Sequence, residues 1–375
     1  MELSLENKNR ILLLMSQHWQ GRYLRRSTQG LDSIAELFEL GAKEQKLRLG
    51  EEAYALLQSY RQAGDDSALA RKLRQLIKLC NDQSVRLLFA KDKDFPKLLL
   101  ETADPPELLF VKGSVEALHW PQLAIVGSRK ASPSGVKQAE QISKELSIAG
   151  IAITSGLALG IDSAAHRGCL AAGGKTIAVL GSGLDQLYPR RNTALSQEII
   201  NTGGALLSEY PFGTPPIAAN FPKRNRIVTG LALGTLVVEA AERSGSLISA
   251  SLALDENREV FAIPGSINNP LSRGCHKLLK QGAVLVEGAE DIAQHLSGAI
   301  QCQLDFKPAT VSPNEESGQS SKPNGLLKFI GYDPLSIDEI QLSSGLKVEE
   351  ISTQLIELEL NGQICQQAGL YQRLK

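Results

Sequence analysis

The sequence contains few cysteines, few aromatic residues and almost no net charge. Its five cysteines in 375 residues are far apart and form no CxxC pair, which excludes a zinc ribbon and a dithiol redox motif. Aromatic residues make up only 5% of the chain, so repeated stacking of bases on aromatic rings is not expected. The formal net charge of −1 means that any nucleic-acid site must be a local cluster of Lys and Arg.

Long hydrophobic runs are absent as well. No apolar stretch reaches the ~18 residues of a membrane-spanning helix. The N-terminus carries Glu2 and Glu6 before a short apolar run, Ile11–Met15, which does not fit a signal peptide. Together with the isolated cysteines, this predicts a cytoplasmic protein with reduced thiols. Hydrophobic residues are 42% of the chain, which excludes general disorder and is compatible with two or three folded domains.

Motifs for catalysis and cofactors are also missing. There is no GxSxG, no HExxH and no cysteine–histidine metal spacing. The segment 173–176 (GGKT) lacks the spacing of a phosphate loop, because Cys169 stands where a glycine is required. The segment 181–183 (GSG) follows a predicted strand, but Gln186 replaces the third glycine of a dinucleotide fingerprint. Serine-hydrolase, metalloenzyme and dinucleotide-binding hypotheses therefore have no support, and we predict no cofactor and no metal.

Residues 1–80 predict a helical domain. Apolar residues recur there at three- and four-residue steps among charges, without the alternation of a strand. The region carries 13 Lys and Arg against 10 Asp and Glu, which suits a small helical bundle with a solvated surface.

Residues 81–299 alternate short apolar runs with amphipathic, helix-like segments. Apolar strands of this kind are typical of a parallel sheet covered on both faces. We predict an α/β fold with a doubly wound parallel sheet that binds its ligand beyond the carboxyl ends of the strands. The predicted strands are Leu123–Val126, Ile151–Thr154, Thr176–Leu180, Ala205–Leu207, Thr235–Val238, Val260–Ile263 and Ala283–Val286. The predicted helices are Val136–Ala149, Ser163–Ala172, Ala194–Asn201, Ser246–Ala253 and Asp291–Leu296.

The C-terminal part predicts a linker and a third domain. Residues 300–324 are rich in Ser, Pro, Gly, Asn and Gln and read as a flexible linker. Residues 325–375 contain helical patterns followed by a short hairpin, which is a winged-helix order. Residues 324–375 hold 4 Lys and Arg against 7 Asp and Glu, which disfavours a duplex-reading transcription factor.

Three turns rich in glycine and serine follow predicted strands. Small residues let the backbone approach a ligand, and free N–H groups at a helix start bind anions. Serine capping explains each turn taken alone, but three such turns at one sheet edge favour an anion site. The turns contain Gly127, Ser128 and Arg129; Ser155 and Gly156; and Ser244, Gly245 and Ser246.

A cationic cluster follows Phe221 and consists of Lys223, Arg224, Asn225 and Arg226. A solvated charge run is the usual explanation of such a cluster. Its position beside the glycine-rich edge favours phosphate binding, because guanidinium groups grip phosphate in a bidentate fork. Phe221 is a candidate stacking platform or a core residue.

Seven motifs in order resemble the DNA-processing protein A family, DprA, also called Smf. The resemblance is strong over residues 85–298, and the flanks fit the family's helical and winged-helix domains. The motifs are LAIVGSRKASPSG (123–135), ITSGLALGIDSAAH (153–166), AVLGSGLDQLYP (178–189), SEYPFGTPP (208–216), FPKRNRIVTGL (221–231), VVEAAERSGSL (237–247) and FAIPGS (261–266).

The resemblance implies an extended Rossmann-like domain with a doubly wound, mostly parallel sheet. It implies a homodimer that binds single-stranded DNA and loads the recombinase RecA during natural transformation or recombination, without catalysis and so without catalytic residues. It implies a DNA pocket made of the three turns and the cationic cluster. The rival hypothesis is a nucleotide-processing hydrolase on a related fold, similar to nucleoside monophosphate phosphoribohydrolases. That enzyme would use Glu239 as an acid or nucleophile, but the Pro-Gly-Gly turn expected before it is missing. A structural role for Glu239 on nearby loop amides is the preferred interpretation.

Overall fold

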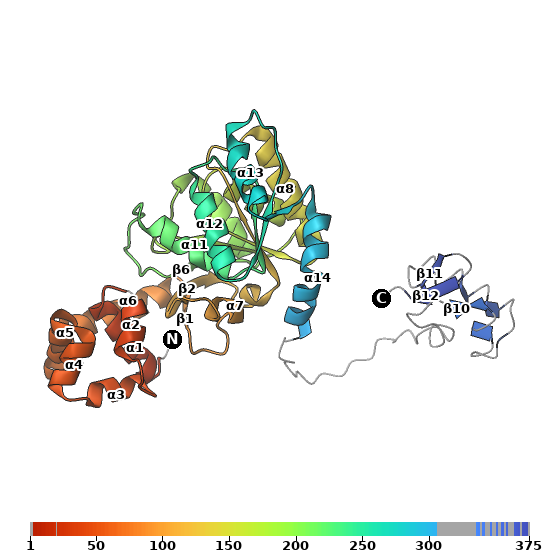
Figure 1. Cartoon of the computed structure of the whole chain (residues 1–375). Coiled ribbons are helices and arrows are strands. Elements are labelled where there is room, and N and C mark those ends of the chain that lie inside the picture. The colour runs from red at the N-terminus through yellow and green to blue at the C-terminus, as the bar shows by residue number, and fades with distance from the viewer. Residues whose placement is uncertain are drawn as a thin grey trace. The chain divides into compact units, whose positions relative to one another are not determined.

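The computed structural model describes residues 3–19 and 21–305, and single residues and short segments between 335 and 373. The chain divides into two compact units, residues 1–307 and 308–375, which are described separately (Figure 1). Helix α14 (Ala289–Asp305) continues six residues past position 299. The prediction of a linker is therefore wrong for residues 300–305, and the rest of the predicted linker, 306–324, lies outside the described residues.

The N-terminal region is helical, as predicted. Helix α6 shows why: Leu69, Leu73, Leu76 and Cys80 recur at three- and four-residue steps and are all buried. The buried leucines of these helices share one hydrophobic cluster with the first strands of the sheet, so the helices pack on the sheet within one compact unit. The helices are α1 (Leu5–Ser16), α2 (Gly21–Ser27), α3 (Ile34–Glu39), α4 (Ala42–Leu49), α5 (Glu51–Ala63) and α6 (Ala68–Asp82), with the short 3-10 helix η1 (Gly64–Asp66).

A nine-stranded sheet forms the centre of the same unit, in the order β1-β2-β6-β5-β4-β3-β7-β8-β9. The strands from β6 to β9 in this order are parallel, and β1 and β2 add an antiparallel edge that was not among the predicted strands. The strands are β1 (Val85–Phe89), β2 (Leu108–Gly113), β3 (Gln122–Val126), β4 (Ala152–Ser155), β5 (Thr176–Leu180), β6 (Ala205–Ser208), β7 (Gly234–Val237), β8 (Glu259–Ala262) and β9 (Val284–Leu285).

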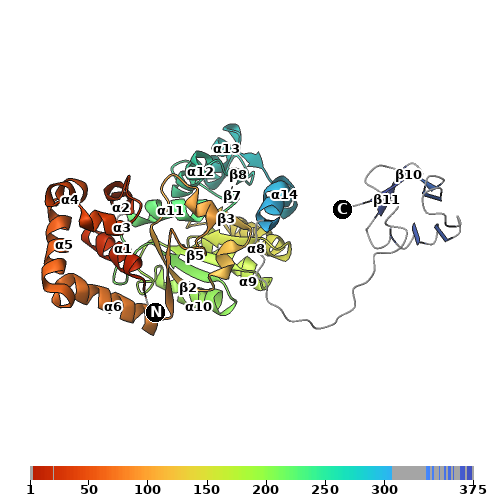
Figure 2. The same ribbon diagram turned by 90° about the horizontal axis from the view of Figure 1, so that it is seen from below.

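Helices cover both faces of the parallel sheet, which confirms the doubly wound prediction (Figure 2). Strand β3 is buried along its whole length, and its residues alternate between two hydrophobic clusters. Ala124 and Val126 pack with α11, α12 and α13, whereas Leu123 and Ile125 pack with α8, α9 and α14. The remaining helices are α7 (Lys97–Leu100), α8 (Pro133–Ile148), α9 (Ile161–Ala171), α10 (Thr193–Asn201), α11 (Asn220–Gly230), α12 (Gly245–Asp255) and α13 (Arg273–Lys280), with the 3-10 helices η2 (Glu116–His119), η3 (Arg190–Asn192) and η4 (Pro270–Ser272).

The strand order reverses beside β3. The chain runs outward from β3 through β4, β5 and β6, and then returns to place β7 on the other side of β3, followed by β8 and β9. At such a switch point the loops after the two central strands diverge and leave a crevice at their carboxyl ends. The turns after β3 and β7 therefore define where a ligand site is expected.

The C-terminal unit contains the predicted hairpin, β11 (Ile364–Gln367) paired antiparallel with β12 (Leu370–Arg373). A two-residue strand β10 (Leu335–Ser336) adds to β12. Ile351, Leu355 and Leu358 are buried together in one hydrophobic cluster of this unit. Among the described residues of both units, no helix is long and apolar enough to span a bilayer.

Candidate nucleic-acid interface

A pocket of about 550 Å³ opens at the switch point between β3 and β7. Its floor is made by the turns after these strands, and its sides by the first turns of α11 and α12. Four of the predicted site residues are not part of its lining: Ser155, Gly156, Lys223 and Arg226. Eight line it: Gly127, Ser128, Arg129, Arg224, Asn225, Ser244, Gly245 and Ser246.

Two loops approach closely beneath the pocket, and glycine permits this. A Cβ on Gly127 would lie 2.5 Å from the side chain of Ile161. Gly160 has φ +79° and a Cβ there would lie 2.2 Å from the carbonyl oxygen of Ser128, which accepts a hydrogen bond from the Ile161 N–H. Any larger residue at either position would separate the loops.

The turn after β4 is satisfied internally, in contrast to its predicted role as an anion donor. The backbone N–H groups of Gly156 and Ala158 donate to the Asp162 carboxylate at 3.1 and 3.3 Å. The Ser155 hydroxyl is fully buried and donates to the carbonyl oxygen of Ile125. Burial raises the pKa of Asp162, and the nearby Arg224 opposes this shift. These amides therefore hold the protein's own carboxylate instead of a ligand.

Arg224 of α11 is buried beneath the pocket. Its guanidinium donates to the carbonyl oxygen of Gly156 at 2.8 Å and to that of Val179. Burial lowers the pKa of Arg224 to about 10, while the Asp162 carboxylate favours its charged form. The guanidinium was predicted to grip phosphate, but in the structure it joins the ends of β4 and β5 to α11.

The rest of the cationic cluster points in different directions, because successive residues of a helix project about 100° apart. Asn225 lines the pocket. Arg226 pairs with Glu209 at 2.6 Å and with Asp104 at 3.2 Å, so its predicted phosphate contact is replaced by two carboxylates. Lys223 is exposed and makes no ion pair with any residue that the structure describes.

An aromatic pair forms one wall of the pocket. The rings of Tyr188 and Phe221 lie 5.8 Å apart, and the guanidinium of Arg129 lies 5.4 Å from the centre of the Phe221 ring. Arg129 is exposed, and Tyr188 is 48% exposed. Phe221 was a candidate stacking platform, whereas Tyr188 was not identified. Its only signal in the sequence was an aromatic residue after the glycine turn 181–183.

The third turn begins helix α12. The Ser244 hydroxyl accepts a hydrogen bond from the Ser246 N–H at 3.2 Å, which is ordinary serine capping. Nothing lies within 4 Å of a Cβ built on Gly245, so the start of the helix is open to the pocket. The positive end of the α12 dipole therefore faces the cavity.

Glu239 has the structural role that was preferred. Its carboxylate accepts hydrogen bonds from the N–H and the hydroxyl of Ser132, at 2.9 and 2.6 Å, at the start of α8. Glu239 is 6% exposed and does not line the pocket. Both carboxylate oxygens are therefore used to hold the loop after β3.

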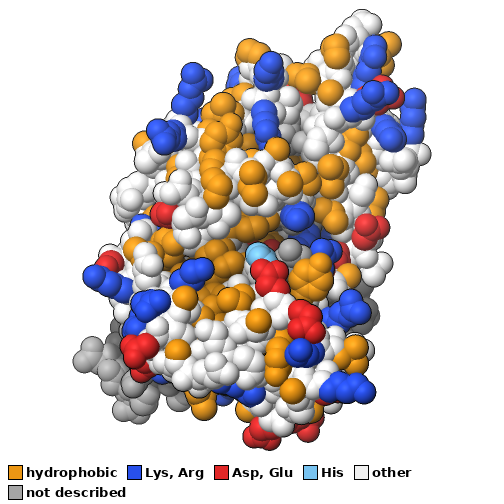
Figure 3. Space-filling model, turned by 90° about the vertical axis from the view of Figure 1, so that its left-hand side faces the viewer, with side chains coloured by type: hydrophobic (Ala, Val, Ile, Leu, Met, Phe, Trp, Pro, Cys, Tyr) orange, Lys and Arg blue, Asp and Glu red, His pale blue; other side chains and the backbone are white. Residues whose placement is uncertain are grey.

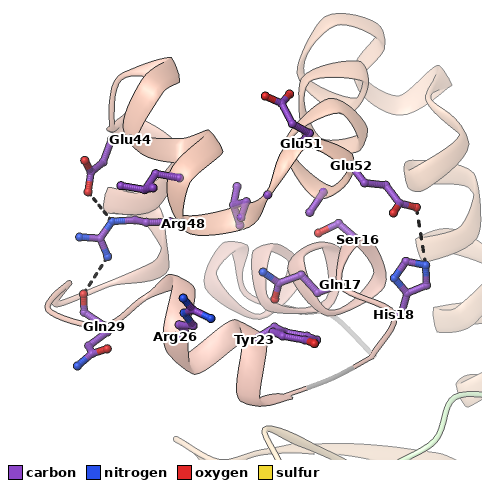
Figure 4. Close-up of a pocket in the computed structure, with 14 residues that line it drawn as sticks. Ser16, Gln17, His18, Tyr23, Arg26, Gln29, Glu44, Arg48, Glu51 and Glu52 are labelled. Carbon is purple, nitrogen blue, oxygen red and sulfur yellow. Dashed lines mark hydrogen bonds and ion pairs between the residues drawn. The ribbon is translucent and has the colours of Figure 1, made fainter.

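A second, larger pocket of about 740 Å³ lies among the N-terminal helices (Figure 4). Arg48 there donates to Glu44 at 2.9 Å and to the Gln29 carbonyl oxygen, and Glu51 and Glu52 also line the cavity. Mixed and internally paired charges of this kind do not favour a phosphate chain. On the face shown in Figure 3, Lys and Arg side chains are likewise spread among hydrophobic and acidic ones.

The fold and the pocket define a Rossmann-like α/β protein with a glycine-rich, cationic pocket at its switch point and a separate C-terminal unit. Residues 86–297 match the family model of DNA recombination-mediator protein A, and residues 307–369 match that of the DprA winged helix domain. The chain belongs to this DprA/Smf family, as its motifs indicated.

Relatives and solved structures agree. Protein Smf of Escherichia coli is 45% identical over 290 residues, which are 77% of each chain. DNA processing protein DprA of Streptococcus pneumoniae is 49% identical over 201 residues, 54% of this chain and 71% of the relative. The X-ray structure of the S. pneumoniae protein matches with a TM-score of 0.66 and 37% identity over 78% of this chain and 98% of that one. A Helicobacter pylori DNA processing protein A, whose structure describes a single-stranded DNA binding mode, matches with a TM-score of 0.52 and 31% identity, covering 57% and 96%.

Proposed function

We propose that this protein binds single-stranded DNA in the switch-point pocket and acts as a recombination mediator. The observation that carries the proposal is the exposed Arg129 lying against Phe221, beside Tyr188 and the open start of α12. This arrangement offers a cation and a helix end to phosphate, and aromatic faces to an unstacked base. The H. pylori relative supports the proposal through its described single-stranded DNA binding mode.

The shape of the pocket favours a single strand over a duplex. A cavity of about 550 Å³ between two loops and two helices accepts a backbone that bends and a base that leaves the stack. Duplex DNA would have to unstack a base pair first, which costs a few kcal/mol. Few groups near the pocket read base edges, Asn225 being one, so sequence preference should be weak.

Downstream of binding, we propose that the protein loads RecA onto the bound strand, and that it acts as a homodimer without catalysing a reaction. Family membership supports this role. Sedimentation of the full chain tests the dimer, and the rate of RecA filament growth on single-stranded DNA, with and without the protein, tests the loading.

The binding proposal is tested by measuring Kd for single-stranded and duplex oligonucleotides at ~150 mM salt, near physiological ionic strength. We expect tighter binding to the single strand. Arg129→Ala should weaken it by about 1.5–3 kcal/mol, roughly a 10- to 150-fold rise in Kd, because one charge-assisted contact is lost. Arg86→Ala, which removes an exposed arginine from the distant edge strand β1, is the matched control. Equal affinity for both DNA forms, or an Arg129→Ala variant that binds normally, would contradict the proposal.

A further inference from the structure

A short segment, Glu101–Glu107, joins the N-terminal helices to both helices that line the pocket. It lies between α7 and β2. Its carboxylates pair with arginines of α2, of α11 and of the turn after α12. We call it the carboxylate segment. None of its residues lines the pocket, so any effect on the pocket must pass through the helices it holds.

Two arginines of the N-terminal helices donate hydrogen bonds to the carboxylate segment. Arg25 of α2 donates to Asp104 and to the carbonyl oxygen of Pro105, and lies 3.5 Å from Glu107. Arg10 of α1 is 4% exposed and donates to the other oxygen of Glu107 at 3.3 Å. Burial raises the pKa of Glu107, and the two arginines oppose the shift.

On the side of the pocket, Asp104 also binds Arg226 of α11. The distance from the Arg226 Nε to the Asp104 carboxylate is 3.2 Å, and the same guanidinium reaches Glu209, just after β6, at 2.6 Å. Asp104 therefore bridges α2 and α11. Arg226 directly follows Asn225 of the pocket, so the ion pair fixes the rotation of the helix that presents Phe221 and Asn225.

The same segment holds the other wall of the pocket. The N–H of Ala103 donates to the Glu256 carboxylate, at 3.0 and 3.1 Å to its two oxygens, where α12 ends. Arg258 donates to Glu101 at 3.4 Å. A Cβ built on Gly230, at the end of α11, would lie 2.8 Å from Thr102, so this helix packs directly on the segment. Both α11 and α12 are thus tied at their far ends, while their first turns form the pocket.

We propose that Asp104, through its pair with Arg226, is a positioning residue for single-stranded DNA. It sets the placement of α11 beside α12, and with it the spacing of the groups that meet the strand. This inference rests on the proposed function. Without Asp104, Arg226 keeps its pair with Glu209 and Arg25 keeps its contact with Glu107. The carboxylate that joins α2 to α11 is then lost, and α11 can shift relative to α12.

The test compares Asp104→Asn with Asp94→Asn in the full chain. Both aspartates pair with an arginine and are about equally exposed, 50% and 54%, but Asp94 contacts Arg86 of β1 and has no link to α11. We expect Asp104→Asn to weaken single-stranded DNA binding roughly 2- to 30-fold, and Asp94→Asn to leave it unchanged. Asp104→Glu, which keeps the charge, should retain most of the affinity.

Salt dependence separates positioning from direct contact. Asp104→Asn and Arg226→Gln should both raise Kd without changing the slope of log K against log salt, because neither residue neutralises a phosphate. An Arg226 that touched phosphate would instead reduce the slope by ~0.7 when removed. Since deleting an anion near DNA strengthens binding by charge alone, unchanged or tighter binding by Asp104→Asn would overturn the inference. Normal binding by Arg129→Ala would instead overturn the proposed site, so the two failures are distinguishable.

Discussion

The guanidinium of Arg224 donates a hydrogen bond to the carbonyl oxygen of Gly156 at 2.8 Å, beneath the pocket and out of solvent. It also lies near the Asp162 carboxylate, which accepts from the Gly156 N–H. Gly156 is thus held through its carbonyl oxygen by Arg224 and through its N–H by Asp162. In the sequence Arg224 looks like its neighbours Lys223 and Arg226, yet the three side chains have three different environments.

Replacement of Arg224 should affect stability more than any other change in the cationic cluster. Arg224→Met leaves the Gly156 and Val179 carbonyl oxygens without their donor and Asp162 without its countercharge. We expect a loss of about 3–5 kcal/mol in the free energy of unfolding, measured by urea denaturation. Lys223→Met, at an exposed position, should change it by less than ~0.5 kcal/mol. Equal stability of the two variants would contradict this assignment.

The salt dependence of DNA binding should be weaker than the number of Lys and Arg residues in the cationic cluster and at Arg129 would suggest. If Arg129 and the three cations of the cluster each contacted one phosphate, the slope of log K against log salt would be near −2.8 for a single strand. Because Arg224 and Arg226 are engaged within the protein, Arg129 and Lys223 remain as exposed cations. We therefore expect a slope of about −1.4 per protomer, obtained from Kd measured over a range of salt concentrations. A slope near −2.8 would show that Arg224 and Arg226 leave their partners within the protein and contact the strand.

His166 should make the protein less stable in mild acid. Its Nδ1 lies 2.7 Å from the Thr176 hydroxyl, which donates to Ile153, so this nitrogen carries the proton and Nε2 has no partner. Burial lowers the pKa of His166 to about 3. Its stabilising contribution is complete above the unfolded pKa of ~6.5 and is lost as the pH falls toward the folded pKa.

The expected slope between about pH 6 and pH 4 is up to ~1.4 kcal/mol of unfolding free energy per pH unit from this group. His166→Gln should remove that component, while His18→Gln, at an exposed position, should leave it in place. Urea denaturation of the three proteins across this pH range provides the measurement. Identical pH profiles for the wild type and His166→Gln would refute the prediction.

The melting temperature of a chain shortened from its C-terminus should depend on whether α14 is kept whole. A chain ending at Gly298 loses the last seven residues of α14, including Ile300, which packs against the cluster around Ile292 and Leu296. We expect its Tm to fall by roughly 2–8 °C, whereas a chain ending at Asp305 should melt like the full protein.

Both truncated chains keep the pocket, and the residues from 306 onward carry six Lys and Arg against nine Asp and Glu. Single-stranded DNA binding should therefore survive in the chain ending at Asp305, or rise slightly as repulsion is removed. A many-fold loss of affinity with an unchanged Tm would place DNA binding in the C-terminal unit instead.

The sequence by itself determined the parallel sheet, because apolar runs such as 176–180 can only be buried on both faces. Glycine and serine at strand ends are local signals, and they predicted a ligand site at the turns after β3, β4 and β7. Of the predicted residues, those after β3 and β7 line the switch-point pocket, whereas Ser155 and Gly156 after β4 do not. The antiparallel strands β1 and β2 escaped prediction, because their pairing joins segments about 20 residues apart, so that no two-residue hairpin turn marks it in the sequence.

Only the tertiary structure decided which cations face the pocket. Composition shows that Lys223, Arg224 and Arg226 are charged, but the turn of α11 and the carboxylates brought near it set their partners. Asp104, Asp162 and Glu209 come from distant parts of the chain, and no spacing in the sequence links them to these arginines. Charge is a local property of a residue, whereas burial and pairing depend on segments that meet only in the folded protein.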